Sequence, residues 1–316
     1  LRALWELTKI LRAGRYDLVH THTSKAGILG RLASHKAGIP CVHSTHGHIF
    51  FPGSGIPGVG PLTRPVLLGI ERRAAKLCRR IFTLSEKEKQ DWVVMQVGPE
   101  ALFEVLPSPV DARRLQAARP RREGLRQAWG LGAGARVIVI AGRLAAEKGH
   151  DTAIRALCEG LDGELWIAGE GPLRAELERL VGSLGLGSRV RFLGHRSDFH
   201  DWLPLADALV MPSLYEGQGL VAVEAFAAGV PVVASRVGGV PEVVSHEVTG
   251  LLVPPGDSAA LAAALRRLQG EPGLAVGLAG RALARVSDFD PLALSRRLES
   301  AYRQVLSADG QRTGLG

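Results

Sequence analysis

The segment Tyr215-Glu-Gly-Gln-Gly-Leu-Val-Ala-Val-Glu224 combines residue types that suit a sugar nucleotide. Gly217 and Gly219 leave backbone N–H groups open at the start of a predicted helix, where unpaired donors and the helix dipole favour a phosphate. The carboxylates of Glu216 and Glu224 can each accept hydrogen bonds from vicinal sugar hydroxyls. A nucleotide sugar carries one sugar on either side of its diphosphate, so this helix mouth is a candidate site for one. The alternative is a helix-start acid followed by a solvated glutamate.

A second segment, Ala141-Gly-Arg-Leu-Ala-Ala-Glu-Lys-Gly149, favours the binding interpretation. It follows a predicted strand and therefore places Arg143 and Lys148 at the carboxyl edge of a sheet, where doubly wound domains bind ligands. Two cations there can neutralise a diphosphate, and their effect grows as the diphosphate leaves. We therefore expect Arg143 and Lys148 to share one site with the two glutamates.

Two further loops end the next two predicted strands. Gly169 and Gly171 lie in Ala168-Gly-Glu-Gly-Pro172, and His195 and Arg196 lie in Leu193-Gly-His-Arg196. We expect these loops to form a shelf for the base of the nucleotide.

Six histidines lie within the first fifty residues, and five of them stand in or beside two expected strands: His20, His22, His43, His46 and His48. A His-x-His pair on one strand is a legitimate pair of metal ligands. No nearby carboxylate or cysteine completes a convincing set, so a role in substrate binding is favoured. We expect neither a metal requirement nor any other cofactor.

The apolar pattern predicts two successive α/β series, and hence two parallel sheets covered by helices. In the first series the expected strands are 17–21, 40–45, 80–84 and 103–106, and the expected helices are 1–11, 25–37, 64–78 and 86–97. In the second the strands are 136–141, 163–168, 189–193, 207–211, 231–234 and 249–253, with helices at 148–159, 172–184, 220–228, 257–269 and 272–286.

The domain organisation follows from these series. Residues 1–110 are expected to form an N-terminal Rossmann-like domain, and residues 136–287 a complete nucleotide-sugar-binding domain. The Arg-rich residues 111–135 are expected to be a linker. Residues 288–316 contain a helix with an apolar stripe that must be buried (Leu292, Leu294, Leu298, Tyr302, Val305).

Composition narrows the function classes. The 316 residues carry a formal net charge of +8 with a sequence pI near 9.9, which predicts an anionic partner. Of such partners we expect a phosphorylated substrate and an anionic membrane surface, not nucleic acid; a merely solvated basic surface is the alternative. The apolar runs are too short to span a bilayer. Three scattered cysteines predict no disulfide framework and favour the cytoplasm, with the inner face of the cell membrane as a docking surface.

These motifs together resemble the C-terminal domain of family 4 retaining glycosyltransferases over nearly all of residues 136–306. The resemblance implies a GT-B fold, with two Rossmann-like domains facing across a cleft. It implies that Arg143 and Lys148 contact the diphosphate, Glu216 the transferred sugar and Glu224 the ribose. The backbone facing the phosphates and sugar would be that of Gly217, Gln218, Gly219, Leu220 and Val221. The resemblance also implies that the helix within residues 288–316 crosses back to the N-terminal domain, near residues 1–15 or the helix after residue 64.

The N-terminal half is similar to the acceptor-side loops of the same family. Its segment His43-Ser-Thr-His-Gly-His48 implies that His46 is the active-site histidine near the donor sugar, and His20, His22 and Ser85 fall on the acceptor side. Ser108-Pro-Val-Asp111 stands where the family has Asn-Gly-Val-Asp. The family's glycine-rich loop after its first strand is absent, which predicts an incomplete N-terminal domain.

The expected function is retaining transfer of a hexose-type sugar from a nucleotide diphosphate sugar to a hydroxyl of a glycan or lipid-linked acceptor. A nucleotide-sugar epimerase of similar architecture and a non-catalytic nucleotide- or membrane-binding remnant are the alternatives.

Two motifs are interpreted as decoys. Gly53-Ser-Gly-Ile-Pro-Gly58 is a dinucleotide pattern interrupted by proline, and Asp288-Phe-Asp290 precedes Pro291 as a helix cap does.

Overall fold

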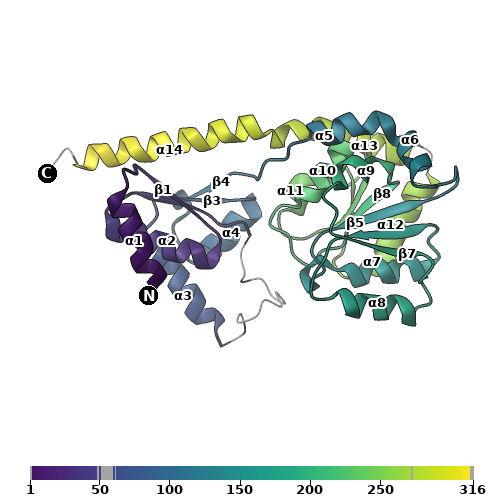
Figure 1. Cartoon of the computed structure of the whole chain (residues 1–316), viewed down its shortest axis with the longest axis horizontal. Coiled ribbons are helices and arrows are strands. Elements are labelled where there is room, and N and C mark those ends of the chain that lie inside the picture. The colour runs from purple at the N-terminus through teal and green to yellow at the C-terminus, as the bar shows by residue number, and fades with distance from the viewer. Residues whose placement is uncertain (1, 48–49, 51–59, 61, 272, 314–316) are drawn as a thin grey trace. The chain divides into compact units, whose positions relative to one another are not determined.

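The computed structural model describes residues 2–47, 50, 60, 62–271 and 273–313. The chain divides into two compact units, which Figure 1 shows as two groups of helices and strands. The first unit comprises Leu1–Ser108 and Pro291–Gly316, and the second comprises Pro109–Asp290. The glycine-rich decoy at residues 53–58 lies outside the described residues.

The first unit is built on a four-stranded parallel sheet of order β1-β2-β3-β4. Its strands are β1 (Val19–His22), β2 (Cys41–Ser44), β3 (Arg80–Thr83) and β4 (Phe103–Val105). Its helices are α1 (Arg2–Ala13), α2 (Ser24–Ala37), α3 (Arg64–Ala75), α4 (Glu86–Val94) and α14 (Pro291–Thr313), with a 3₁₀ turn at Glu100–Leu102. The expected strands of this half are all present.

Successive residues of β3 point to opposite faces of the first sheet. Ile81 packs into a cluster with Trp92 of α4, and Phe82 packs into another cluster with Ala301 of α14. Because strand side chains alternate between faces, a strand buried on both faces needs covering elements on both. Helix α14 therefore supplies the cover for one face of this sheet.

The expectation that the last helix packs on the first half of the chain is confirmed, but its contact differs. Helix α14 lies over the sheet, where Val305 is buried and Leu298 is partly buried, and Arg297 donates a hydrogen bond to the Val105 carbonyl (2.8 Å). The predicted neighbours, residues 1–15 and the helix after residue 64, do not make these contacts. Leu292, expected in the buried stripe, is 61% exposed.

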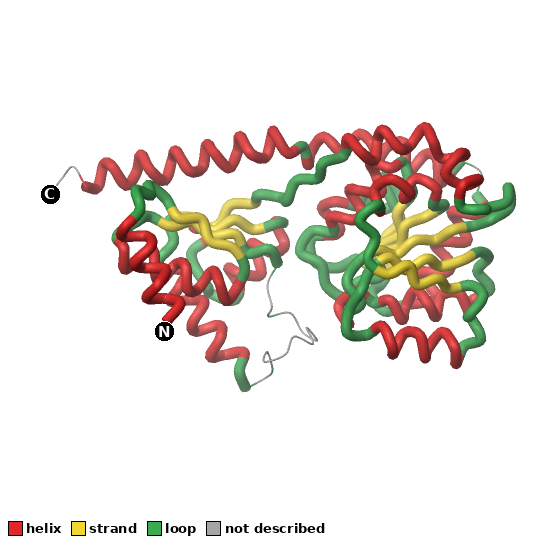
Figure 2. Tube along the Cα trace, in the orientation of Figure 1, coloured by secondary structure: helices red, strands yellow, loops and turns green. Residues whose placement is uncertain are grey.

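The second unit contains a six-stranded parallel sheet of order β10-β9-β8-β5-β6-β7. Figure 2 shows this sheet in yellow, with helices above and below it. Its strands are β5 (Val137–Ala141), β6 (Glu164–Ala168), β7 (Val190–Gly194), β8 (Ala208–Met211), β9 (Val232–Ser235) and β10 (Leu251–Val253). Its helices are α5 (Arg113–Ala118), α6 (Arg122–Ala128), α7 (His150–Ala156), α8 (Arg174–Ser183), α9 (Phe199–Trp202), α10 (Leu220–Ala228), α11 (Val240–Val243), α12 (Ser258–Gly270) and α13 (Leu274–Ala284). Short 3₁₀ turns accompany several of them.

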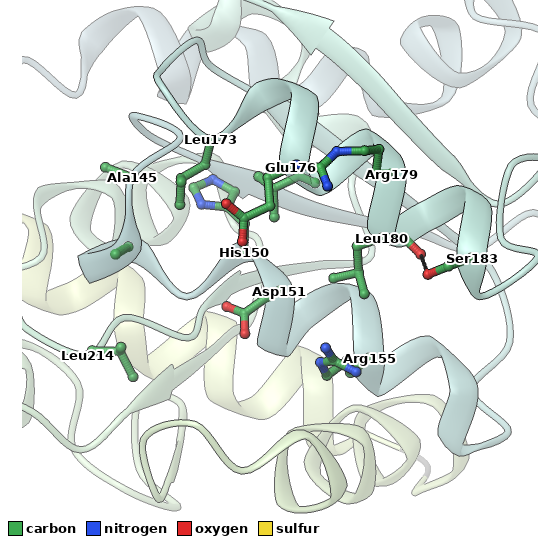
Figure 3. Close-up of a pocket in the computed structure, with 12 residues that line it drawn as sticks. Ala145, His150, Asp151, Arg155, Leu173, Glu176, Arg179, Leu180, Ser183 and Leu214 are labelled. Carbon is green, nitrogen blue, oxygen red and sulfur yellow. Dashed lines mark hydrogen bonds between the residues drawn. The ribbon is translucent and has the colours of Figure 1, made fainter. Parts of the chain in front are cut away.

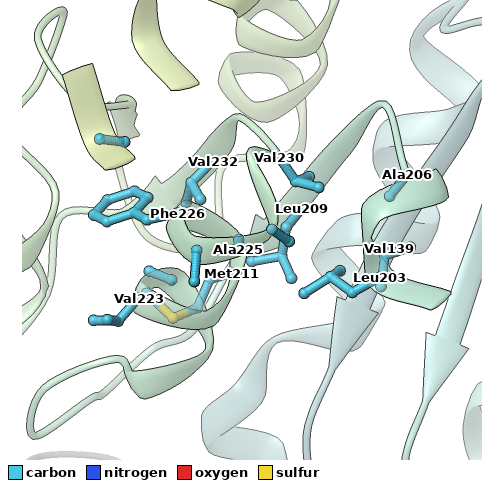
Figure 4. Close-up of a cluster of buried hydrophobic side chains, with 14 of the residues drawn as sticks. Val139, Leu203, Ala206, Leu209, Met211, Val223, Ala225, Phe226, Val230 and Val232 are labelled. Atoms are coloured by element: carbon cyan, nitrogen blue, oxygen red, sulfur yellow. The ribbon is translucent and has the colours of Figure 1, made fainter. Parts of the chain in front are cut away.

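Helices cover both faces of this second sheet. Val137 and Val139 of β5 pack with α10 residues such as Phe226, and Ile138 and Ile140 pack on the opposite face. Figure 4 shows the first of these clusters, with the side chains of α10 beside those of β8 and β9. Nearly continuous apolar runs in the strands are what two-sided burial requires.

Residues 111–135, predicted as a linker, instead belong to the second unit. Helices α5 and α6 bring Leu115 (0% exposed) and Leu125 against the same core as α10. Arg122 and Arg126 both pair with Asp207 (2.7 and 3.2 Å), which also accepts the Val137 amide (2.8 Å) at the start of β5. The prediction failed because two arginines of this segment, Arg122 and Arg126, bond to residues 204–207 immediately before β8 instead of facing solvent.

The acidic decoy Asp288-Phe-Asp290 has structural contacts. Asp288 forms an ion pair with Arg285 (2.6 Å), and Phe289 is buried in the core of the second unit. Pro291 then begins α14.

Candidate functional site

The direction in which the chain crosses the second sheet reverses between β5 and β8. These two strands are neighbours, but the chain continues from β5 toward β6 and from β8 toward β9, in opposite directions across the sheet. Loops at such a switch point diverge, and ligands of doubly wound sheets bind between them. The loops concerned, residues 142–149 and 212–219, carry three of the four side chains singled out in the sequence: Arg143, Lys148 and Glu216.

Lys148 and Glu216 meet directly across this switch point. The Lys148 ammonium donates to Glu216 Oε1 at 2.6 Å, and the Ser213 hydroxyl donates to the same oxygen at 2.9 Å. The side chains are 28% and 12% exposed. Because a carboxylate held by two donors has a fixed orientation, Glu216 is positioned before any ligand arrives. The sequence did not single out Ser213.

Arg143 lies beside Lys148 but is more open to solvent. Its guanidinium donates to Glu147 Oε1 at 2.6 Å and is 64% exposed. Burial alone would raise the pKa of the Glu147 carboxyl. The Arg143 hydrogen bond and the nearby Lys148 charge outweigh burial, so the pKa lies below its usual value and the carboxyl stays ionised. The Glu147 carbonyl in turn accepts the Leu214 amide (2.8 Å), which ties the two loops together.

Gly149 allows these loops to approach closely. A Cβ at this position would lie 2.1 Å from the Pro212 carbonyl oxygen, and the residue has a left-handed φ of +63°. Only glycine adopts that conformation without strain and leaves room for the neighbouring backbone.

A third loop, which follows β9, also supports Glu216. The Gly239 amide donates to the Glu216 carbonyl at 3.1 Å, and a Cβ on Gly238 would lie 1.9 Å from that same oxygen. The sequence analysis missed this loop, although the two adjacent glycines after a buried strand were a visible signal.

Helix α10 begins immediately after the Glu216 loop. Its N-cap residue is Gly219 (φ +88°), no side chain caps the helix, and its first turn contains no acid. The positive end of the helix dipole is therefore not neutralised locally. Gln218 is buried, Val221 is half-buried and Leu220 is exposed.

Glu224 lies on the second turn of α10 and contacts a residue that the sequence analysis did not identify. Its Oε1 is 3.0 Å from Nε2 of His200 on α9. The two side chains are 23% and 34% exposed. Nothing in the sequence pattern marks His200, because its partner is distant along the chain.

The predicted shelf is a set of backbone contacts between three loops. The Gly142 amide donates to the Ala168 carbonyl (2.9 Å) and the Gly169 amide to the Gly194 carbonyl (2.8 Å). A Cβ on Gly169 would lie 1.9 Å from the Gly142 oxygen, and one on Gly171 would lie 2.4 Å from the Leu144 oxygen. These glycines therefore hold the loops after β5, β6 and β7 together.

The two side chains expected at this shelf differ in their contacts. His195 is exposed. Arg196 forms a bidentate pair with Asp198 (2.7 and 2.5 Å), and its guanidinium lies 5.3 Å from the Trp129 ring centre. Arg196 therefore has protein partners that fix its orientation.

A pocket of about 540 Å³ lies near these loops, between α7 and α8 (Figure 3). It is lined by Ala145, Leu173 and Glu176, among others, and by His150, whose ring nitrogens have no hydrogen-bond partner within the described residues. Burial lowers the pKa of His150 to about 4. Arg143, Lys148, Glu216 and Glu224 do not line this pocket.

In the first unit, the side chain of His20 on β1 contacts both the neighbouring strand β2 and helix α14. Its Nδ1 lies 2.5 Å from the hydroxyl of Tyr302 on α14, and its Nε2 lies 2.8 Å from the Ser44 hydroxyl on β2. Burial, together with the nearby His22 and His46, lowers the pKa of His20 to about 4.

His22 and His46 form a pair at the same end of the sheet. Their ring nitrogens Nδ1 and Nε2 are 2.9 Å apart, and the His22 ring lies 4.1 Å from that of His20. Burial lowers the pKa of both, and His22 contributes further to the lowering at His46. His46 has a left-handed φ of 55°, a strained conformation of the kind that gathers at functional sites.

The remaining predicted residues of this unit have structural contacts. His43 is buried and bonded to the Thr21 hydroxyl (2.9 Å), and burial lowers its pKa to about 2. Ser85 is 2% exposed and caps α4 by accepting the Glu88 amide (3.1 Å). His48 lies outside the described residues. Within the described part of the chain, no group of three or more His, Cys, Asp or Glu side chains is arranged to hold a metal ion.

Comparisons with known proteins match both halves of the chain to one family. Residues 1–114 match the profile described as "Glycosyltransferase Family 4", and residues 135–271 match "Glycosyl transferases group 1". A 2-deoxystreptamine glucosyltransferase from Streptomyces kanamyceticus is 33% identical over 285 residues, which cover 85% of this chain and 72% of that protein. The chain belongs to family 4 of the glycosyltransferases.

Further relatives of this glycosyltransferase carry related names. A D-inositol 3-phosphate glycosyltransferase from Catenulispora acidiphila is 32% identical and covers 96% of this chain and 77% of its own length. A UDP-Gal:alpha-D-GlcNAc-diphosphoundecaprenol alpha-1,3-galactosyltransferase from Escherichia coli is 31% identical over a segment that covers 80% of this chain and 66% of that protein. All three relatives are longer than the segment they share with this chain.

Solved structures confirm the predicted GT-B fold of this glycosyltransferase. Anabaena HepE in complex with UDP matches with a TM-score of 0.83 and 25% identity over 95% of this chain and 82% of that one. The same protein has been solved with UDP-glucose. Among the described residues, no helix is both long and apolar enough to cross a membrane.

Proposed function

We propose that this glycosyltransferase binds a nucleotide diphosphate sugar at the β5–β8 edge of the second unit and transfers its hexose with retention of anomeric configuration. The observation that carries the proposal is the Lys148–Glu216 contact (2.6 Å) at the switch point, beside the uncapped N-terminus of α10. A diphosphate between Lys148, Arg143 and the α10 N-terminus would meet two cations and a helix dipole.

The two sugars of the donor would lie on either side of this diphosphate. Glu216 would accept hydrogen bonds from the transferred hexose, and Glu224 from the ribose. The likeness to HepE, which has been solved with UDP and with UDP-glucose, supports a UDP-linked donor. No metal or other cofactor enters the proposal.

The proposed reaction is attack by an acceptor hydroxyl on the face of the sugar that the diphosphate leaves. The bond from the acceptor oxygen to the anomeric carbon forms as the bond to the phosphate oxygen breaks, and the departing phosphate takes the hydroxyl proton. Lys148 would stabilise the negative charge that develops on the leaving group. His46, His20 and His22 would line the acceptor side; for Ser85 the structure provides only the helix cap.

For the acceptor we propose the hydroxyl of a glycan or lipid-linked sugar, in polysaccharide assembly at the inner face of the cell membrane. The E. coli relative, whose name specifies a diphosphoundecaprenol-linked acceptor, supports this choice, and the net charge of +8 suits an anionic surface.

Saturation-transfer NMR with UDP, GDP and ADP tests the donor site, and product anomer analysis tests retention. We expect one nucleotide to give saturation transfer that is lost in Lys148→Met. Transfer to GlcNAc-diphosphoundecaprenol, compared with D-inositol 3-phosphate, separates lipid-linked from small soluble acceptors. An inverted product, or no nucleotide binding, would refute the proposal.

A further inference from the structure

His200 lies on a rigid part of the second unit, next to the proposed ribose ligand. It belongs to α9, which is anchored by Trp202, a side chain only 2% exposed in the core of this unit. Phe199 stacks edge-on against Trp202 with ring centres 5.3 Å apart. Because its neighbours on α9 pack in fixed positions, the backbone of His200 is also fixed.

The hydrogen bond between His200 and Glu224 has a definite polarity. An ionised carboxylate only accepts hydrogen bonds, so His200 Nε2 donates its N–H to Glu224 Oε1 across 3.0 Å. This occupies one carboxylate oxygen and leaves Oε2 for another donor. A glutamate side chain otherwise samples several rotamers, and the bond selects one of them.

A second carboxylate lies near the same imidazole. The pKa of Asp111 is lowered to about 2, chiefly by hydrogen bonds from Arg113 and to a smaller extent by the charge of His200. Asp111 precedes α5, the segment that was predicted to be a linker and instead packs on α9 and α10. Arg114 of α5 also pairs with Asp201 of α9 (2.6 Å), so α9 is held by α5 as well as by the core of this unit.

We propose that His200 is a positioning residue that holds the Glu224 carboxylate in the orientation that binds the ribose diol, and so favours ribonucleotides over nucleotides without these hydroxyls. The inference rests on the proposed role of Glu224. His200 does not touch the ligand in this account. Because the hydrogen bond already restricts the Glu224 side chain, this side chain loses less conformational entropy when the diol binds. Preorganisation of this kind raises affinity without adding a contact.

Calorimetric titration with UDP and with 2′,3′-dideoxy-UDP tests the proposal. Relative to the unaltered chain, His200→Ala should weaken UDP about three- to tenfold, the cost of immobilising one glutamate side chain on binding. It should leave dideoxy-UDP affinity unchanged, because that nucleotide offers no diol. His200→Gln, which can still donate an amide N–H, should restore most of the UDP affinity. His35→Ala, at an exposed histidine of the first unit, controls for loss of an imidazole.

Glu224→Gln separates the inference from the function on which it rests. If this variant binds UDP and dideoxy-UDP like the unaltered chain, Glu224 does not bind the ribose and both assignments fail. If Glu224→Gln loses UDP affinity while His200→Ala does not, only the positioning role is wrong. Equal weakening of both nucleotides by His200→Ala would indicate a general structural role and would also overturn the proposal.

Discussion

Neutralising Glu216 should separate the binding of the nucleotide from the binding of the sugar. In the structure Lys148 is committed to Glu216 at 2.6 Å, so an arriving diphosphate must share this cation or displace it from the carboxylate. Glu216→Gln keeps the size of the side chain and an oxygen that the Ser213 hydroxyl can still reach, but removes the competing charge. We therefore expect UDP to bind as well as before or slightly better.

The magnitude follows from the exposure of the pair. Two unit charges near a protein surface attract by about 4 kcal/mol at 4 Å, but screening and desolvation reduce partly exposed pairs to about 1 kcal/mol net. Lys148 is 28% exposed, so UDP should bind up to about fivefold more tightly. The nucleotide sugar loses charge-assisted hydrogen bonds to its hexose, about 1.5–3 kcal/mol, so Glu216→Gln should bind it roughly 10- to 150-fold more weakly than the unaltered chain does.

The assay is calorimetric titration of Glu216→Gln with UDP and with the matching UDP-sugar, alongside a transfer assay in which activity should be lost. Glu178→Gln, which removes a carboxylate from an exposed helical ion pair on α8, provides the control. A parallel loss of affinity for UDP and UDP-sugar would mean that Glu216 supports binding of the nucleotide and not of the hexose, and would refute the assignment.

Three further predictions concern stability and surface charge. Gly149→Ala combines a left-handed φ with a Cβ 2.1 Å from the Pro212 oxygen. It should lower the free energy of unfolding, measured by urea titration, by more than about 2 kcal/mol. An unchanged urea midpoint would contradict the loop geometry. His150 has a folded-state pKa of about 4 against 6.5 in the unfolded chain. Its contribution to the free energy of unfolding is therefore full above pH 6.5 and falls by about 3 kcal/mol toward pH 4. His150→Leu should flatten this decline, and an equal decline in the variant would exclude His150 as its cause. Flotation with phosphatidylglycerol vesicles should recover the chain at low salt and less at high salt, whereas equal recovery with neutral vesicles would leave only a solvated basic surface.

The features of the second unit that the sequence predicted were local ones. Six short apolar runs bounded by glycine and proline became β5–β10, because two-sided burial of parallel strands leaves that pattern in the sequence itself. The carboxyl ends of parallel strands share one edge, so Arg143, Lys148 and Glu216 could be placed together without knowing their contacts.

Contacts between distant segments could not be predicted in the same way. Residues 111–135 carry no clear apolar period, and their place in the second unit depends on Leu115 entering a distant core and on Arg122 and Arg126 reaching Asp207. The Glu224–His200 and Tyr302–His20 hydrogen bonds likewise join elements whose proximity only the tertiary fold determines.

A crystal structure of the chain with a bound UDP-sugar tests the central claim most directly. The account predicts the diphosphate between Lys148 and the N-terminus of α10, the ribose hydroxyls on Glu224 and the hexose on Glu216. A nucleotide bound elsewhere, for example in the pocket between α7 and α8 that is lined by His150, would contradict it.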